Sequence, residues 1–154
     1  MSLVSIEENA KTLANIEKVA VGMALFFDYG LYPDFLGHHS GFERNANAVA
    51  SNLAKFHIAI IPADFIAESW KKNHNRGEKR TTDNFVLYVN HYFENGYYQI
   101  LDILTPEAHS CIDHLLPHYV ELAERFNSLR KADLEKLEHY TVNHSLAKNI
   151  TLTS

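Results

Sequence analysis

Three polar side chains whose types suit proton transfer and oxyanion binding lie on either side of one predicted β-hairpin. Arg80 and Asp83 come just before the first strand, and His109 comes just after the second. A histidine exchanges protons near neutral pH, and an arginine offers a planar, forked set of donors to an oxyanion. Antiparallel strands joined by a short turn bring their outer ends together. We therefore expect these three residues, distant in sequence, to be neighbours in a site.

The hairpin is the clearest element of the sequence. Its strands, at residues 85–93 and 97–104, are rich in β-branched and aromatic residues. The turn between them contains Asn95-Gly96, which supplies the positive-φ positions that a tight turn between twisted strands needs. The pattern therefore predicts two paired antiparallel strands.

Helices are predicted before and after this hairpin. The capping-box pattern Ser5-x-x-Glu8, followed by apolar residues at three- and four-residue spacing, predicts a helix over residues 5–29. The remaining patterns predict, in order, a loop at 30–41, a helix at about 42–54, a strand at 56–61, a helix at 106–127 kinked or broken near Leu116 by Pro117, and a helix at 132–148.

This layout predicts an α+β fold with helices packed on one face of a small antiparallel sheet, N-terminal helices preceding the hairpin and C-terminal helices following it. The hairpin, at about 85–104, would be central to the sheet. We place a single domain at residues 1–127, with its sheet within about 55–104. Residues 128–154 are expected to be a C-terminal helical extension.

The bulk composition is that of a globular chain of one domain. The sequence has 154 residues, 46% hydrophobic and 21% charged. It has no apolar run long enough to span a membrane, no signal-peptide order at its start, and a lone cysteine, Cys111, that cannot form an internal disulfide. We therefore expect a cytoplasmic protein. The net charge of −5 argues against indiscriminate binding of nucleic acid.

One basic segment departs from this acidic balance. Residues 71–80 hold five lysines or arginines against one acid, Glu78, and lead directly into the hairpin. A solvated surface loop and a phosphate-contacting loop are both consistent with this charge.

Ten histidines raise the question of a metal site. His114 and His118 are four residues apart and His118 and Glu121 three apart, as helical metal ligands often are. Pro117 lies between the two histidines, so a shared helical face is not assured. We therefore expect no metal and assign most histidines to the surface or to interfaces. His57, inside an apolar strand, is either a buried hydrogen-bonded group or a side chain facing a site.

Residues of about 25 to 127 resemble the YafO family of type II toxin–antitoxin toxins, whose members are similar to RelE-type ribosome-dependent mRNA interferases. Several short motifs carry the resemblance by their order and spacing around one hairpin. They are Pro33-Asp34-x-x-Gly37, His57-Ile58, Arg80-Thr81-x-Asp83, Ile103-Leu104, Pro106-Glu107-x-His109, His118 and Ala123-Glu124-x-Phe126.

The resemblance implies a RelE-like fold and a metal-independent endoribonuclease, without a cofactor, that inhibits translation by cleaving mRNA in the ribosomal A site. The RNA 2′-hydroxyl would attack the adjacent phosphate, giving a 2′,3′-cyclic phosphate and a 5′-hydroxyl. We assign His109 as the leading general acid/base, Arg80 as the phosphate clamp, and Asp83 as the group that orients either of them. The RNA or ribosome would be held by Lys71, Lys72, Arg76 and Lys79, with His57 and His118 as secondary candidates.

The resemblance also implies a cognate antitoxin, the ribosome and mRNA as partners, and no membrane. Two other classes of protein remain consistent with the sequence. An acidic interaction or immunity-type protein is favoured by the net charge of −5 and by the C-terminal extension. A metal-dependent hydrolase could be built on the histidines. The oligomeric state has no signal in the sequence.

Overall fold

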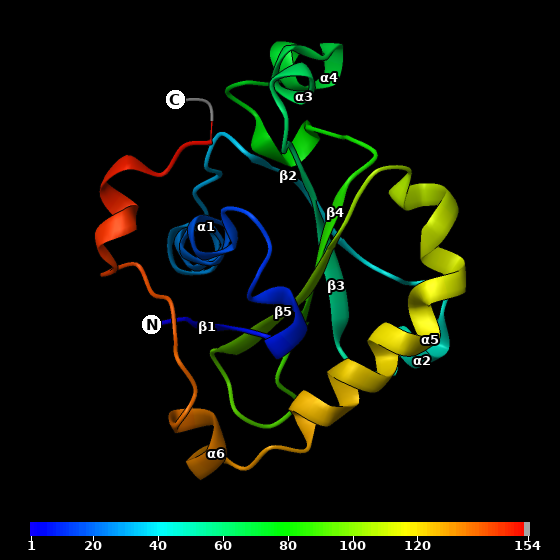
Figure 1. The fold of residues 1–154 in the computed structure, drawn as a ribbon, viewed down its shortest axis with the longest axis vertical. Helices are drawn as coiled ribbons and strands as arrows, with labels where there is room; N and C mark the ends of the chain where they lie inside the picture. Colours follow the sequence, from blue (N-terminus) through cyan, green and yellow to red (C-terminus); the bar gives the residue numbers. More distant parts are fainter. Residues whose placement is uncertain (153–154) are drawn as a thin grey trace.

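The fold is a five-stranded mixed sheet with a long helix on each face (Figure 1). The computed structural model describes residues 1–152, and its strand order is β1-β5-β4-β3-β2. β1 runs parallel to β5, and every other neighbouring pair is antiparallel. The predicted α+β class is confirmed, although the sheet is mixed rather than antiparallel. The strands are β1 (Leu3–Ile6), β2 (Leu36–Gly41), β3 (Leu53–Ile58), β4 (Phe85–Asn90) and β5 (Tyr97–Leu104).

Helices α1 and α5 cover opposite faces of the sheet, so the prediction of helices on one face was wrong (Figure 1). The reason is that alternate strand residues are apolar on both faces: Phe56 and Val86 pack toward α1, whereas Phe85 and Leu87 pack toward α5. The helical elements are η1 (Glu8–Ala10), α1 (Ile16–Tyr29), α2 (Ala46–Ala50), α3 (Pro62–Ile66), α4 (Glu68–Lys72), η2 (Gly77–Lys79), α5 (Ala108–Asn127), α6 (Lys131–Glu135) and η3 (Ser145–Asn149). Within residues 1–152, none of these helices has both the length and the apolar character to cross a membrane.

The predicted hairpin is confirmed as β4 and β5. Gly96 has a φ of 87°, as the Asn-Gly turn required, but β4 ends at Asn90 and the connection is therefore longer than predicted. The buried ring of His91 holds this connection: its Nδ1 accepts the amides of Phe93 and Glu94 at 3.2 and 3.0 Å, and its Nε2 lies 3.0 Å from the Leu129 carbonyl. This histidine therefore has a structural place, away from the hairpin's outer ends.

The N-terminal helix predicted over residues 5–29 begins only at Ile16, and residues 3–6 form β1 instead. Val4 and Ile6 are buried in the core beside α1. The Ser5 hydroxyl donates to the Tyr98 carbonyl at 3.1 Å rather than capping a helix. Pairing with β5 satisfies the backbone of this segment, and that long-range gain outweighs the local helix signal.

The structure also contains more strand between residues 30 and 61 than the sequence predicted. The segment predicted as a loop at 30–41 contains β2, an edge strand whose polar sequence hides its role. The helix predicted at about 42–54 is shortened to α2, because residues from Leu53 onward belong to β3. The strand predicted at 56–61 is this same β3, beginning earlier and ending at Ile58.

Helix α5 continues through Pro117 as one helix, so of the kink or break predicted near Leu116 the break does not occur. Pro117 is exposed, so the side of the helix that lacks a backbone donor faces water. The short helices α3 and α4 lie at one end of the molecule, away from α6 (Figure 1). The basic segment begins in the last turn of α4.

The prediction of a long helix at 132–148 was wrong, because only the short helices α6 and η3 form there. The residues between them cross to the edge of the sheet, where Tyr140 and Val4 exchange backbone hydrogen bonds of 2.7 and 3.1 Å. Farther on, the Lys18 ammonium donates to the Thr151 carbonyl at 2.9 Å. The C-terminal extension is therefore packed against β1 and α1.

Candidate functional site

Two imidazole rings and one ammonium group converge on the ring of Phe85, which is fully buried on the α5 face of the sheet. The rings of His57 and His109 have their centroids 5.0 and 4.6 Å from that of Phe85, each edge to face. The Lys55 Nζ lies 4.2 Å from the same centroid. Lys55 and His57 are alternate residues of β3, so their side chains leave the same face. Phe85 is thus the floor of a cluster that contains two imidazole rings and one ammonium group.

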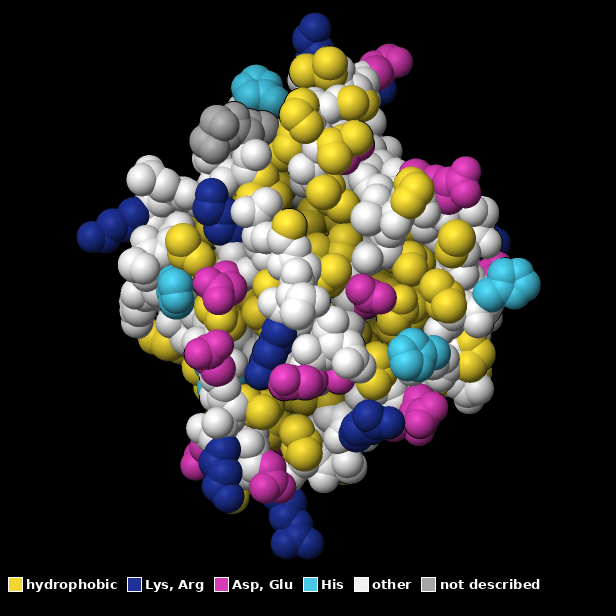
Figure 2. Space-filling view, in the orientation of Figure 1, with side chains coloured by type: hydrophobic (Ala, Val, Ile, Leu, Met, Phe, Trp, Pro, Cys, Tyr) yellow, Lys and Arg dark blue, Asp and Glu magenta, His cyan; other side chains and the backbone are white. Residues whose placement is uncertain are grey.

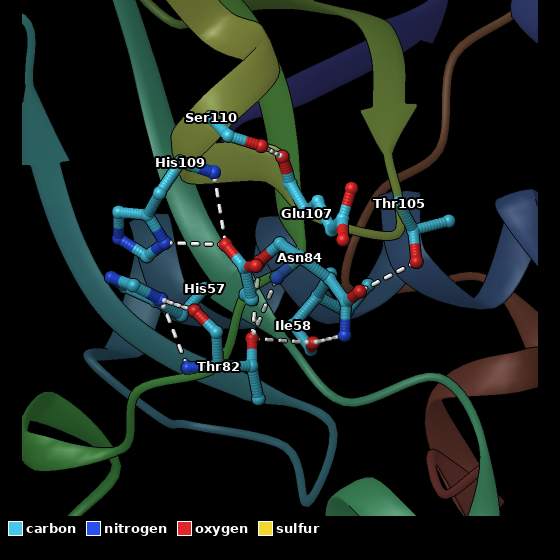
Figure 3. Close-up of polar contacts among 9 residues, drawn as sticks. His57, Ile58, Thr82, Asn84, Thr105, Glu107, His109 and Ser110 are labelled. Atoms are coloured by element: carbon cyan, nitrogen blue, oxygen red, sulfur yellow. Dashed lines mark hydrogen bonds and ion pairs between the residues drawn. The ribbon is translucent and has the colours of Figure 1, made fainter.

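Asp83 and His109 form a hydrogen-bonded pair at this cluster, as the hairpin argument predicted (Figure 3). One Asp83 carboxylate oxygen accepts the His109 amide at 2.9 Å and lies 2.6 Å from the His109 Nδ1. The backbone amide bond and the imidazole contact hold the pKa of Asp83 below its usual range. Because an ionised carboxylate only accepts hydrogen bonds, the His109 Nδ1 carries the proton and donates it in a hydrogen bond to Asp83. The Nε2 of the exposed His109 ring is then unprotonated in the neutral ring and able to contact a substrate.

His57 lies beside this pair and is 6% exposed. Its Nδ1 is 2.7 Å from the carbonyl oxygen of Thr82 and 3.0 Å from its amide nitrogen (Figure 3). A protonated Nδ1 can donate to the carbonyl and an unprotonated one can accept from the amide, so either tautomer has a partner. Its ring centroid lies 5.6 Å from that of His109 and 6.0 Å from that of His38. Burial lowers the pKa of His57 to about 4, so the ring is neutral at pH 7.

Acidification is expected to destabilise the fold between pH 6.5 and pH 4. The folded chain holds the pKa of His57 at about 4, so within this window the unfolded chain binds more protons. The free energy of unfolding should therefore fall as the pH drops, by about 3 kcal/mol from this one group. Urea denaturation at pH 7, 5.5 and 4 measures it. His57→Gln is the control, since burial also lowers the pKa of His39 and His139. An equal loss in that variant would show that His57 is not responsible.

Arg80 lies in the interior rather than in the site, with 4% of its surface exposed. Its guanidinium donates to four backbone carbonyls, those of Asn73 at 3.1 Å, Pro33 at 3.0 Å, Leu36 at 2.9 Å and His74 at 2.5 Å. These bonds use the donors that a phosphate would need. The geometry therefore gives no support to the predicted phosphate clamp. Arg80 instead links the start of β2 and the residues before it to the segment between α4 and β4.

The four cations predicted to hold RNA are all exposed, and they lie in α4, in η2 and between them: Lys71, Lys72, Arg76 and Lys79. Arg76 makes an ion pair of 3.7 Å with Glu78 at the surface. The carbonyl of Glu78 lies 3.0 Å from the Nδ1 of His38, whose ring neighbours that of His57. The basic segment therefore borders the cluster through His38.

His118, the other secondary candidate, is not brought to the cluster. It is exposed on α5, nine residues beyond His109, which is about 13 Å along a helix axis. Within residues 1–152, no group of three or more His, Cys, Asp or Glu side chains could hold a metal ion.

Lys55 is the site residue that sequence reasoning missed. Its place two residues before His57 in a strand was the available signal, because alternate residues share a face. Burial lowers the pKa of Lys55, and the charge of Asp113 opposes that shift. Lys55 also lines a cleft of about 350 Å³ between the segment after β2 and the first turns of α5.

A family model described as Toxin YafO, type II toxin–antitoxin system, matches residues 24–128. The match spans more than half of the chain and contains Lys55, His57, Asp83 and His109. A search of the curated proteins and a search of the solved structures each found no match. The part outside the match includes β1 and the C-terminal segment that bridges to it. The chain therefore belongs to the YafO family of type II toxin–antitoxin toxins.

Proposed function

We propose that this toxin inhibits translation by cutting mRNA in the ribosomal A site, with the cluster over Phe85 as its catalytic site. Membership of the family implies a cognate antitoxin as a partner. The observation that most supports an RNA-cleaving site is the convergence of Lys55, His57 and the Asp83–His109 pair on one surface. These are the types of group that RNA cleavage through the 2′-hydroxyl requires.

In this proposal His109 is the general base. Asp83 takes the Nδ1 proton as a hydrogen bond, so the lone pair of Nε2 faces the RNA and accepts the proton of the 2′-hydroxyl. The 2′ oxygen then attacks the adjacent phosphorus and the bond to the 5′ oxygen breaks. The products are a 2′,3′-cyclic phosphate and a 5′ oxygen that takes a proton from solvent. Asp83 also faces the imidazolium that forms, as the carboxylate does in other Asp–His pairs.

His57 and Lys55 act on the charge that develops at phosphorus. Since its lowered pKa keeps His57 neutral at pH 7, the tautomer that accepts the Thr82 amide at Nδ1 carries a proton at Nε2 and can donate it in a hydrogen bond. Lys55 supplies the positive charge beside the phosphate, the role that we predicted from the sequence for Arg80. The catalytic role moves to Lys55 because the Arg80 guanidinium is committed to carbonyl groups.

The exposed cations around α4 and η2 would hold the RNA backbone or ribosomal RNA. Figure 2 shows lysine or arginine side chains at the end of the molecule that α3 and α4 form. Contacts between such groups and phosphates strengthen binding without regard to sequence and weaken as salt rises. This arrangement supports recognition of a large RNA surface by an acidic chain whose net charge is −5.

The test adds the purified protein to a cell-free translation reaction and maps the 5′ ends of the mRNA. A ribosome-free reaction, His109→Ala and the exposed control His118→Ala run in parallel. Cuts that need both ribosomes and His109 would support the proposal. Cuts in naked RNA would remove the dependence on ribosomes. If translation is undisturbed and no cuts are found, the proposal fails and the acidic interaction-type protein becomes the favoured function.

A further inference from the structure

The cleft beside the His57–His109 cluster has the wall chemistry of a nucleotide site. It holds about 350 Å³ between the segment after β2 and the first turns of α5. Phe42, Ile112 and Leu116 provide apolar wall, and Lys55, Arg44 and Asp113 provide charge. A nucleotide combines apolar base faces, a polar base edge and an anionic phosphate, so each part has a complementary surface here.

Lys55 makes this cleft continuous with the catalytic cluster. Its Nζ lies 4.2 Å from the centroid of Phe85, the floor of the cluster, and 4.8 Å from the centroid of Phe42, the wall of the cleft. One ammonium group therefore reaches both sides. An RNA whose scissile phosphate lies at Lys55 must place an adjacent nucleoside in or beside the cleft.

The charged groups of the cleft indicate which base edge it would favour. Within residues 1–152, the Asp113 carboxylate and the Arg44 guanidinium make no hydrogen bond and no ion pair within 4 Å, and both residues are exposed. The charge of Asp113 acts on Lys55 from a greater distance, so its oxygens keep their capacity to accept hydrogen bonds. An ionised carboxylate only accepts hydrogen bonds, so Asp113 favours a base that presents an amino group. Adenine, cytosine and guanine present one on their pairing edge, whereas uracil presents only a ring N–H between two carbonyl oxygens there.

We propose that this cleft binds the nucleoside next to the scissile phosphate, and that Asp113 biases the choice toward amino-bearing bases. Phe42 contacts the base, Lys55 contacts the phosphate, and the exposed Arg44, which lines the same cleft, contacts the rest of the strand. The catalytic use of the cleft rests on the proposed function above. Its binding of a nucleotide does not, and the two can be tested separately.

The first arm titrates isotope-labelled protein with adenosine, cytidine, guanosine and uridine 3′-monophosphates and follows backbone amide shifts. The expected shifts centre on residues 42–45 and 112–116, with the amino-bearing nucleotides binding about tenfold more tightly than the uridine nucleotide. Asp113→Asn should remove most of this preference. Glu121→Gln is the matched control, since it neutralises an exposed acid farther along the same helix. Shifts that avoid the cleft, or a preference unchanged in Asp113→Asn, would overturn the proposal.

The second arm compares cut positions in the cell-free translation reaction. Asp113→Asn should redistribute cuts among bases, whereas Glu121→Gln should leave the pattern of the unmodified protein. An unchanged pattern in Asp113→Asn, with cutting intact, would overturn the nucleoside site and leave the proposed function standing. If the unmodified protein binds nucleotides in the cleft but does not cut mRNA, the proposed function fails and the nucleoside site stands. If Asp113→Asn cuts normally but escapes neutralisation by the antitoxin, the cleft is a protein-binding surface and the proposal fails.

Discussion

His109→Ala is expected to slow mRNA cleavage by roughly 100- to 10,000-fold without unfolding the protein, because it removes the proposed general base. The His109 side chain is 60% exposed, and the backbone bond from its amide to Asp83 does not depend on the ring. The variant should therefore keep the start of α5 in place. Cleavage rates in the translation reaction, together with thermal unfolding, measure the two quantities separately.

Asp83→Asn gives a graded comparison for the same site. It keeps the size of the side chain but removes the carboxylate that takes the Nδ1 proton of His109. Its expected loss is smaller than that of His109→Ala, with a changed pH profile, because the ring remains but its tautomer is no longer fixed. The exposed control His118→Ala should cleave normally. Full activity of His109→Ala would remove the Asp83–His109 pair from the catalytic role.

Arg80→Ala is expected to lower the free energy of unfolding by about 3–5 kcal/mol, mainly by leaving buried carbonyls without donors. The guanidinium joins Pro33 and Leu36, near β2, to Asn73 and His74, which follow α4. Urea denaturation at pH 7 measures the loss. Arg80→Lys should also destabilise, since one ammonium cannot reproduce the forked donor set.

Arg76→Ala is the matched control for this prediction. Arg76 lies in the same basic segment, but its side chain is 60% exposed and its ion pair with Glu78 is at the surface. The expected change in stability is within about 0.5 kcal/mol. If Arg80→Ala were as stable as the unmodified protein yet unable to cleave RNA, the phosphate-clamp role would be restored to Arg80.

The sequence could predict the elements that neighbouring residues determine, such as the hairpin, but not those that depend on a distant partner, such as β1. Asn95-Gly96 and the flanking β-rich runs predicted the hairpin, and the hairpin placed Asp83 beside His109. β1 has no such signal, because its partner strand β5 lies far along the chain. In its place Ser5 and Glu8 matched a local helix-start pattern that the tertiary pairing overrode.

The candidate site was predicted in part for the same reason. Arg80 was chosen for its residue type, but its partners are backbone carbonyls, and a carbonyl group has no sequence signature. Lys55 could have been found, since it alternates with His57 in the strand. Its nearness to Phe85 depends on the pairing of β3 with β4, which the sequence did not specify.

The pairing of β1 with segments that follow it at long range has a consequence for biosynthesis. β1 is made well before its partner β5, and the Tyr140 bridge to Val4 can form only after residue 140 has been made. Contacts between such distant residues close large loops and slow folding. A nascent chain stopped before residue 140 leaves the outer edge of β1 without this bridge. In this toxin the outer edge of β1 is therefore covered only after all five strands of the sheet have been made.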